Sequence, residues 1–220
     1  MSWLASACHG ALDVLLGVRC LGCSAPGSTW CRECVDAAAS PRTWQDGQLR
    51  ITAACRYRDD VADAINAHKE RGHLTLSAPL GLLLAAAVIV RVNATDPILM
   101  VPCPSSRRVV KARGHDHAAR LAISAARWIH RSNPATPVPP QVAAVLQQRP
   151  GLRDQVGLSP TERFDNMRDA FVSRRNGEGR PVIIVDDITT SGATLLAAAS
   201  ALGGAGWSVR GAAVVADARA

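Results

Sequence analysis

Residues 182–194 read Val-Ile-Ile-Val-Asp-Asp-Ile-Thr-Thr-Ser-Gly-Ala-Thr. The four β-branched residues at the start have the continuous apolar character of a strand that is buried on both faces, as in a parallel sheet. The Ala- and Leu-rich stretch 192–202 that follows has helical spacing. The sequence therefore predicts that two adjacent carboxylates, Asp186 and Asp187, lie at the carboxyl end of a central strand, just before a helix.

The loop between this predicted strand and helix contains small and hydroxyl-bearing residues. They are Thr189, Thr190, Ser191, Gly192, Ala193 and Thr194. The backbone N–H groups of such a loop, together with the amino end of a helix, bind an oxyanion. Asp186 and Asp187 would repel an anion, but they accept hydrogen bonds from a vicinal diol or hold Mg²⁺. Donors for phosphate beside acceptors for hydroxyls indicate a ribose with a 5-phosphate, and an acidic turn that only caps the helix is the alternative.

The same stretch resembles the phosphoribosyl pyrophosphate (PRPP) motif of type I phosphoribosyltransferases. The resemblance implies that Asp186 and Asp187 bind the ribose 2- and 3-hydroxyls and that residues 189–194 bind the 5-phosphate. It also implies PRPP as the ligand, with Mg²⁺ as its companion ion. The segment before the motif strand often supplies a mobile lid in these enzymes, so we expect one within 149–171, with a surface loop as the alternative.

The rest of the chain alternates between strand and helix patterns. The predicted elements are strands at 51–56, 98–101 and 207–216 and helices at 59–68 and 118–130. This alternation favours an α/β fold with a mainly parallel sheet. The strand at 98–101 leads into a hydroxyl-rich, basic loop, which in a parallel sheet opens on the same edge as the acid pair. We expect its residues Ser105, Ser106, Arg107 and Arg108 to bind pyrophosphate, with a solvated basic loop as the alternative.

Four cysteines near the amino end have the spacing of metal ligands. They form Cys20-x2-Cys23-x7-Cys31-x2-Cys34, which predicts one structural Zn²⁺ in a closed tetrahedral shell, with a redox-active dithiol as the alternative. The polar stretch 38–49 suggests a seam between a zinc-binding module at 1–45 and a phosphoribosyltransferase-like domain at 46–220. The apolar residues within 1–16 are expected to pack on that domain. Cys8, Cys55 and Cys103 are interpreted as small buried hydrophobic residues.

The order of motifs along nearly the whole chain is similar to the ComF family. The shared elements are the cysteine pairs, Tyr57 with Lys69, Val101-Pro102-x-Pro104, Arg113-Gly114, Gln155, Leu158, Arg163, Asn166, Ala170-Phe171 and the acid pair. The resemblance implies a zinc module on a type I phosphoribosyltransferase fold, and a link to the handling of incoming single-stranded DNA. Relatives usually read Arg-Gly-Phe-Asn-Gln where this chain reads Arg113-Gly114-His115-Asp116-His117. Because alternate residues point to different faces, we do not expect His115 and His117 to share a metal.

Composition limits the classes of function. The net charge of +7 and a pI near 9.5 favour polyanionic partners such as nucleic acid or phosphorylated metabolites. The longest apolar run, 80–90, has eleven residues, about half of a membrane span, and the start of the chain lacks a secretory signal, so we expect a cytoplasmic protein.

The leading hypothesis for function is PRPP binding with phosphoribosyl transfer, in which pyrophosphate is released and the acceptor is not identified. The alternative is a non-catalytic protein that handles single-stranded DNA during DNA uptake and keeps the phosphoribosyl site for binding. For that role, Trp30 and Trp44 are the only plausible stacking pair, although packing in a core or interface suits both better. The sequence predicts no oligomeric state.

Overall fold

The fold centres on a sheet of six strands in the order β1-β2-β8-β7-β3-β4. The computed structural model describes residues 17–92, 97–132, 138–149 and 170–219. The strands are β1 (Arg42–Asp46), β2 (Leu49–Arg56), β3 (Leu99–Pro102), β4 (Gln141–Val142), β7 (Pro181–Thr189) and β8 (Ser208–Asp217). β1 pairs with β2 in antiparallel fashion, and every other neighbouring pair is parallel. The predicted α/β fold with a mainly parallel sheet is confirmed.

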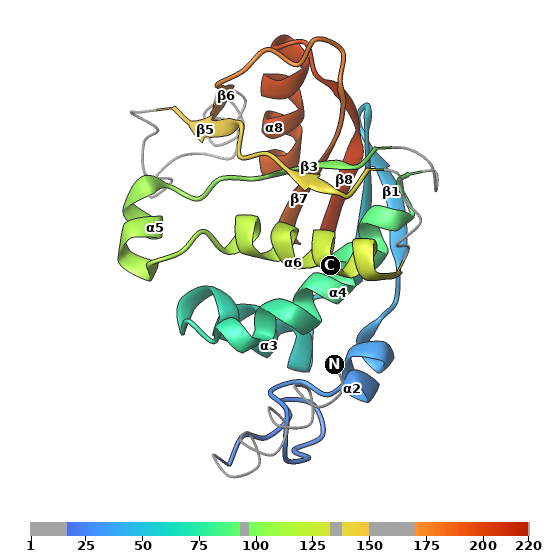
Figure 1. The fold of residues 1–220 in the computed structure, drawn as a ribbon, viewed down its shortest axis with the longest axis vertical. Coiled ribbons are helices and arrows are strands. Elements are labelled where there is room, and N and C mark those ends of the chain that lie inside the picture. Colours follow the sequence, from blue (N-terminus) through green and yellow to red (C-terminus); the bar gives the residue numbers. More distant parts are fainter. Residues whose placement is uncertain (1–16, 93–96, 133–137, 150–169, 220) are drawn as a thin grey trace.

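Helices cover both faces of this sheet (Figure 1). On one face lie α3 (Asp59–Glu70), α4 (Ser77–Ile89) and α6 (His117–Ser132). On the other lie α8 (Ala193–Gly204) and a two-stranded antiparallel ribbon of β5 (Leu146–Gln148) and β6 (Phe171–Ser173). The shorter helices are α2 (Arg32–Ala38), the 3₁₀ turn η1 (Leu74–Leu76) and α5 (Arg107–Arg113).

Residues 182–185 of the central strand β7 are all apolar because both of their faces are covered. Val182 and Ile184 pack in the cluster that contains α8, whereas Ile183 and Val185 pack in the cluster that contains α4 and α6. Side chains of a strand alternate between its two faces, so a strand with helices on both sides must be apolar throughout. The alternation continues into the acid pair, and Asp187 therefore faces α3 and α6.

The cysteine-bearing segment packs against the main core. Cys20, Trp30 and Val35 are buried in the same hydrophobic cluster as α3 and α4, and Trp30 Nε1 donates a hydrogen bond of 3.1 Å to Asp60 Oδ2. Cys55 and Cys103 are buried, as expected; Cys8 and the apolar segment 1–16 lie outside the described residues. The division into 1–45 and 46–220 stays a prediction.

Two segments differ from the expectation. The basic segment expected as a loop is helical from Arg107 onward, because Ser106 Oγ caps α5 by accepting the backbone N–H of Val109 at 3.2 Å. The polar stretch 38–49 contains β1, whose residues alternate in exposure because the strand pairs with β2 at the sheet edge. Among the described residues, no helix is both long and apolar enough for a membrane crossing.

Candidate functional site

The acid pair lies at the carboxyl end of β7, beside the loop that follows β3. β3 and β7 are parallel neighbours, with Pro102 opposite Val185, so both loops open on one edge of the sheet, as predicted. Both carboxylates turn back onto the strand: Asp186 Oδ1 accepts the N–H of Asp187 at 2.9 Å, and Asp187 Oδ1 accepts the N–H of Ile188 at 2.8 Å. The second oxygen of Asp187 faces away from the strand toward α3 and α6.

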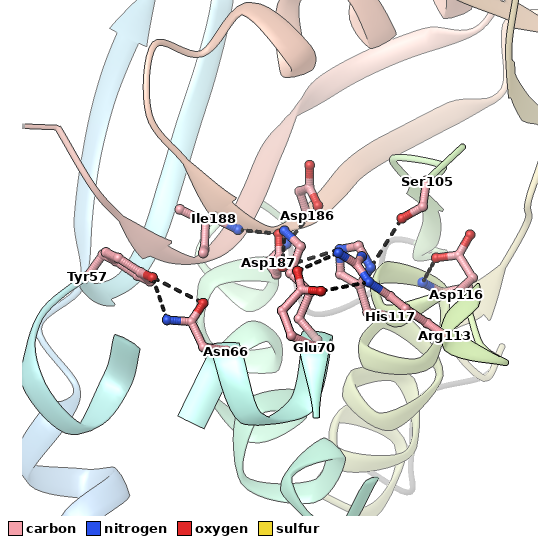
Figure 2. A network of polar contacts seen from close by, with 12 residues as sticks. Tyr57, Asn66, Glu70, Ser105, Arg113, Asp116, His117, Asp186, Asp187 and Ile188 are labelled. Atoms are coloured by element: carbon pink, nitrogen blue, oxygen red, sulfur yellow. Dashed lines mark hydrogen bonds and ion pairs between the residues drawn. The ribbon is translucent and has the colours of Figure 1, made fainter. Parts of the chain in front are cut away.

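Two nitrogen atoms from different helices approach that second oxygen (Figure 2). Asp187 Oδ2 lies 3.1 Å from Lys69 Nζ at the end of α3 and 3.2 Å from His117 Nε2 at the start of α6. The other ring nitrogen of His117, Nδ1, lies 3.2 Å from Ser105 Oγ in the loop after β3. His117 therefore connects the acid pair to the loop that we expect to hold pyrophosphate.

The two neighbouring carboxyl groups are perturbed in opposite directions. Burial, together with the adjacent charge of Asp187, raises the pKa of Asp186 well above its usual range. Burial alone would raise the pKa of Asp187 too, but the contacts with His117 and Lys69 outweigh it and hold that pKa well below its usual range. Divergent pKa values in a closely spaced pair are typical of a functional site.

The loop after β7 has the features of the predicted phosphate cradle. Thr189 is buried and its Oγ1 has no hydrogen-bond partner among the described residues, whereas Thr190 and Ser191 are exposed. Gly192 is the N-cap of α8 with a φ of 78°, a left-handed conformation that favours glycine. A Cβ atom at this position would lie 2.4 Å from Asp46 Oδ2. Ala193 and Thr194 begin the helix.

A cavity of about 610 Å³ adjoins the loop after β3. Ser105 and Ser106 line one side of it, and the β5–β6 ribbon and its flanks line another. Three cationic side chains also line it, namely Lys111, Arg149 and Arg174. Arg174 Nε donates a hydrogen bond of 2.8 Å to Gln147 Oε1, which orients the guanidinium. Of the two arginines predicted here, Arg108 is exposed and does not line the cavity, and the side chain of Arg107 lies outside the described part of the structure.

Further polar contacts hold the elements around the acid pair in place (Figure 2). Arg113 Nε, at the end of α5, donates a hydrogen bond of 3.1 Å to Glu70 Oε2 at the end of α3. Tyr57 and Asn66 form hydrogen bonds between the end of β2 and α3. These contacts fix the carboxyl end of α3, and thereby the position of Lys69.

The cysteine cluster has the geometry of a metal centre. The sulfur atoms of Cys20, Cys23, Cys31 and Cys34 lie within 4.8 Å of one another. Cys20 Sγ accepts backbone N–H groups from Gly22 at 3.4 Å and Cys31 at 3.3 Å. Burial raises the pKa of this thiol, but the backbone donors more than offset burial and lower it to about 6. The pKa values of the Cys31 and Cys34 thiols are raised, and the neighbouring thiols contribute to this. The four sulfur atoms could therefore hold one metal ion.

Several residues of the site carried no assigned role in the sequence. His117 was considered only as a partner of His115, but His115 packs against His68 with ring centroids 5.7 Å apart, whereas His117 faces the acids. Arg149 and Arg174 belong to strand ends that are distant from the motifs. The expected lid falls largely on residues 150–169, which lie outside the described residues.

Comparison with known proteins identifies the carboxyl-terminal part of the chain. Residues 118–220 match the family model of the phosphoribosyl transferase domain. These residues include α6, β7 with the acid pair, the loop at 189–194 and α8. A search of curated proteins finds no match. The mainly parallel α/β architecture agrees with this match, and residues 118–220 are therefore similar to a phosphoribosyl transferase domain.

Proposed function

We propose that the protein binds PRPP and transfers its phosphoribosyl group to a nitrogen nucleophile, with release of pyrophosphate. The observation that carries this proposal is the position of the acid pair. Asp186 and Asp187 end a buried central strand, directly before a loop that caps α8 and directly beside the loop after β3. The matched phosphoribosyl transferase domain contains the acid pair and the α8 loop.

In this proposal the ribose 2- and 3-hydroxyls donate to Asp186 and Asp187, and the 5-phosphate is bound by residues 189–194. The amino end of α8, a twelve-residue helix, contributes roughly half a positive charge. Thr190 and Ser191 are exposed, Gly192 has a left-handed backbone, and the backbone N–H of Ala193 donates to Ser191 Oγ at 3.4 Å. The groups that would donate hydrogen bonds to the phosphate thus follow directly in the chain after the carboxylates that would accept hydrogen bonds from the ribose hydroxyls.

The pyrophosphate group would occupy the cavity next to Ser105 and Ser106. Arg107 and Arg108 stay predictions from the sequence, and Arg108 does not line this cavity. We add Lys111, Arg149 and Arg174, because these three do line it. Their side chains make no ion pair among the described residues, so their charge is available to a bound anion. Mg²⁺ would accompany PRPP and neutralise part of the pyrophosphate charge.

The chemistry is a displacement at C1 of the ribose. The acceptor nitrogen forms a bond to C1 while the bond from C1 to the pyrophosphate oxygen breaks, and pyrophosphate leaves with the electron pair. The residues of this chain would contribute chiefly by positioning the sugar and by stabilising the charge on the leaving group. A structural Zn²⁺ on the four cysteines would order the amino-terminal segment against the core.

Calorimetry with PRPP and Mg²⁺ tests the proposal. We expect Asp186→Asn and Asp187→Asn each to weaken binding by roughly ten- to a hundredfold, since a hydrogen bond to a charged group contributes about 1.5–3 kcal/mol. Asp63→Asn, which changes an exposed acid on α3, serves as the control. Absence of PRPP binding by the wild-type protein would contradict the proposal. A pyrophosphate-release assay over a panel of nitrogen bases measures turnover.

The pyrophosphate contacts have a test of their own. Arg174→Gln removes a guanidinium that lines the cavity, whereas Arg175→Gln changes the adjacent exposed arginine, which does not line it. We expect the first variant to weaken the binding of inorganic pyrophosphate several-fold and the second to leave it unchanged. Equal effects in both variants would show that Arg174 makes no specific contact with pyrophosphate.

The finer resemblance to the ComF family, the cytoplasmic location and the alternative function in single-stranded DNA handling stay predictions. For the alternative, Trp30 is buried against the core and Arg219 lies over the ring of Trp44 at 3.4 Å, so neither ring is an open stacking platform. A salt-sensitive shift of single-stranded DNA, lost in Arg107→Ala/Arg108→Ala, together with PRPP binding without turnover, would favour this alternative.

A further inference from the structure

His117, Asp186 and Asp187 bring three potential ligand atoms together outside the cysteine cluster. One imidazole nitrogen and one oxygen from each carboxylate lie within 4.8 Å of one another. His117 Nε2 and Asp187 Oδ2 are 3.2 Å apart. A cation about 2.1 Å from each ligand holds neighbouring ligand atoms about 3.0–3.4 Å apart, at right or tetrahedral angles. The spacing of this pair is therefore that of two ligands on one ion.

The surroundings of His117 favour a free nitrogen that faces the acids. Ser105 Oγ lies 3.2 Å from Nδ1 and can accept its proton, which leaves the lone pair on Nε2. Histidines that bind metals generally donate their other N–H to an oxygen in this way. In that tautomer Nε2 can bind a cation. The cation replaces the proton through which Nε2 contacts the Asp187 carboxylate in the ion pair, and that proton goes to solvent.

The carboxylate of Asp187 is the second observation that indicates a cation site. The residue is 3% exposed, and its Oδ2 accepts no hydrogen bond from the described residues. The two nitrogen atoms near it are at ion-pair distance only. Of these, Lys69 is 27% exposed at its side chain, so its long stem allows the ammonium to move to solvent when a divalent ion arrives. Lys69 thus takes the place of the cation in the metal-free protein.

We propose that His117, Asp186 and Asp187 form a second metal site, which takes a divalent transition cation such as Mn²⁺. The ligand set decides the class of ion. Mg²⁺ prefers oxygen ligands and retains its waters, whereas an imidazole nitrogen with two carboxylates suits Mn²⁺ and its neighbours in the transition series. Any role of this ion in phosphoribosyl transfer rests on the proposed function, but the binding of the ion does not.

Electron paramagnetic resonance with Mn²⁺ tests the site in the full-length protein, with zinc already bound at the cysteine cluster and measured independently. We expect the wild-type protein to bind one Mn²⁺, with spin-echo modulation from a coordinated imidazole nitrogen. His117→Gln should weaken Mn²⁺ binding by more than about tenfold, because loss of a residue that only orients a metal ligand already weakens binding by about that factor. The same substitution should abolish the nitrogen signal. His130→Gln changes an exposed histidine near the end of the same helix and serves as the matched control.

A second variant acts in the opposite direction. Lys69→Met removes the ammonium that competes for Asp187, so Mn²⁺ should bind several-fold more tightly than in the wild type. This result does not depend on the folding of the His117 variant. The proposal fails if the wild type binds no Mn²⁺, if its bound ion shows no nitrogen coupling, or if Lys69→Met weakens the binding.

The outcome is separable from that of the proposed function. Calorimetry with PRPP in the presence of Mg²⁺ alone reports the phosphoribosyl site. Mn²⁺ binding without PRPP binding would support the metal site and contradict the proposed function, and the reverse result would contradict only the metal site.

Discussion

The cysteine cluster and the acid-pair cluster are assembled from the chain in opposite ways. The first takes all four ligands from residues 20–34, whereas the second combines the start of α6, the end of β7 and the end of α3. In each cluster the potential ligand atoms lie within 4.8 Å of one another. The cysteine cluster lies in a segment that is too short to form its own core. The acid-pair cluster forms only when the elements of the main fold have packed together. We therefore expect metal at the first to control stability and ligands at the second to control function.

Removal of the metal from the cysteine cluster should have the largest effect on stability. Cys20, Trp30 and Val35 belong to the main core, so a loosened module also weakens the packing of α3 and α4. Loss of several kcal/mol would lower the unfolding temperature by roughly 10 °C. Calorimetry and tryptophan fluorescence with and without a chelator measure this, and added zinc should restore both.

Cys23→Ser is the variant for the same test, because the Cys23 side chain is exposed and contributes little packing. A protein that unfolds at the wild-type temperature with this substitution would contradict a structural role of the metal.

Asp187→Asn should destabilise the protein less, by about 2 kcal/mol. The substitution leaves Lys69 and His117 without their counter-charge in a buried site, which typically costs about 3–5 kcal/mol when both partners are fully buried. Lys69 reaches solvent, and this reduces the cost. Urea denaturation measures the difference, with Asp63→Asn as the exposed control, which should stay within about 0.5 kcal/mol of wild type. Equal stability of the two variants would show that the ion pairs contribute nothing.

Gly192→Ala should cost about 1–2 kcal/mol, because a Cβ atom is unfavourable in the left-handed conformation and would meet Asp46. Gly203, within α8, has open space around the position of a Cβ atom. Gly203→Ala should therefore stabilise the helix by up to about 1 kcal/mol. Denaturation curves of the two variants should move in opposite directions, and a shift in the same direction would refute the constraint at position 192.

Asp186→Asn should have the smallest effect on stability and the opposite sign to Asp187→Asn. The pKa of Asp186 is raised in the folded protein by burial and by the adjacent charge of Asp187, so its ionised form is disfavoured there, and removal of the charge should stabilise the fold at neutral pH. The folded state binds the extra proton, so this group adds stability as the pH falls through its raised pKa. Urea denaturation at pH 7 and at pH 5 compares wild type and variant. If the variant is less stable than the wild type at pH 7, the pKa of Asp186 is not raised in the folded protein.

The fold and much of the site could be predicted because they depend on local patterns. The apolar run 182–185 requires helices on both faces of a strand, and the cysteine spacing brings the four sulfurs together within one short segment. β1 and α5 were missed for a related reason. β1 is stable only through its pairing with β2, and α5 depends on a single capping serine in a segment whose prolines and arginines indicated a loop.

The position of His117 shows where prediction from sequence ends. His117 faces the acid pair, whereas His115 packs against His68. Nothing in the spacing of the two histidines indicated that α6 would begin against the carboxyl end of β7. The same is true of Arg149 and Arg174, which reach the cavity only because the β5–β6 ribbon lies beside the loop after β3.

The amino-acid order alone established the α/β class, the acid pair with its hydroxyl-rich loop, and the four metal-spaced cysteines, because each of these features is a short-range relation between neighbouring residues. Only the tertiary structure decided which groups face Asp187. Lys69 and His117 come from helices that are distant in the chain, and the parallel order of β3 and β7 determines where those helices and Ser105 lie. The charge around the acid pair, and with it the difference between Asp186 and Asp187, is therefore a property of the packed fold.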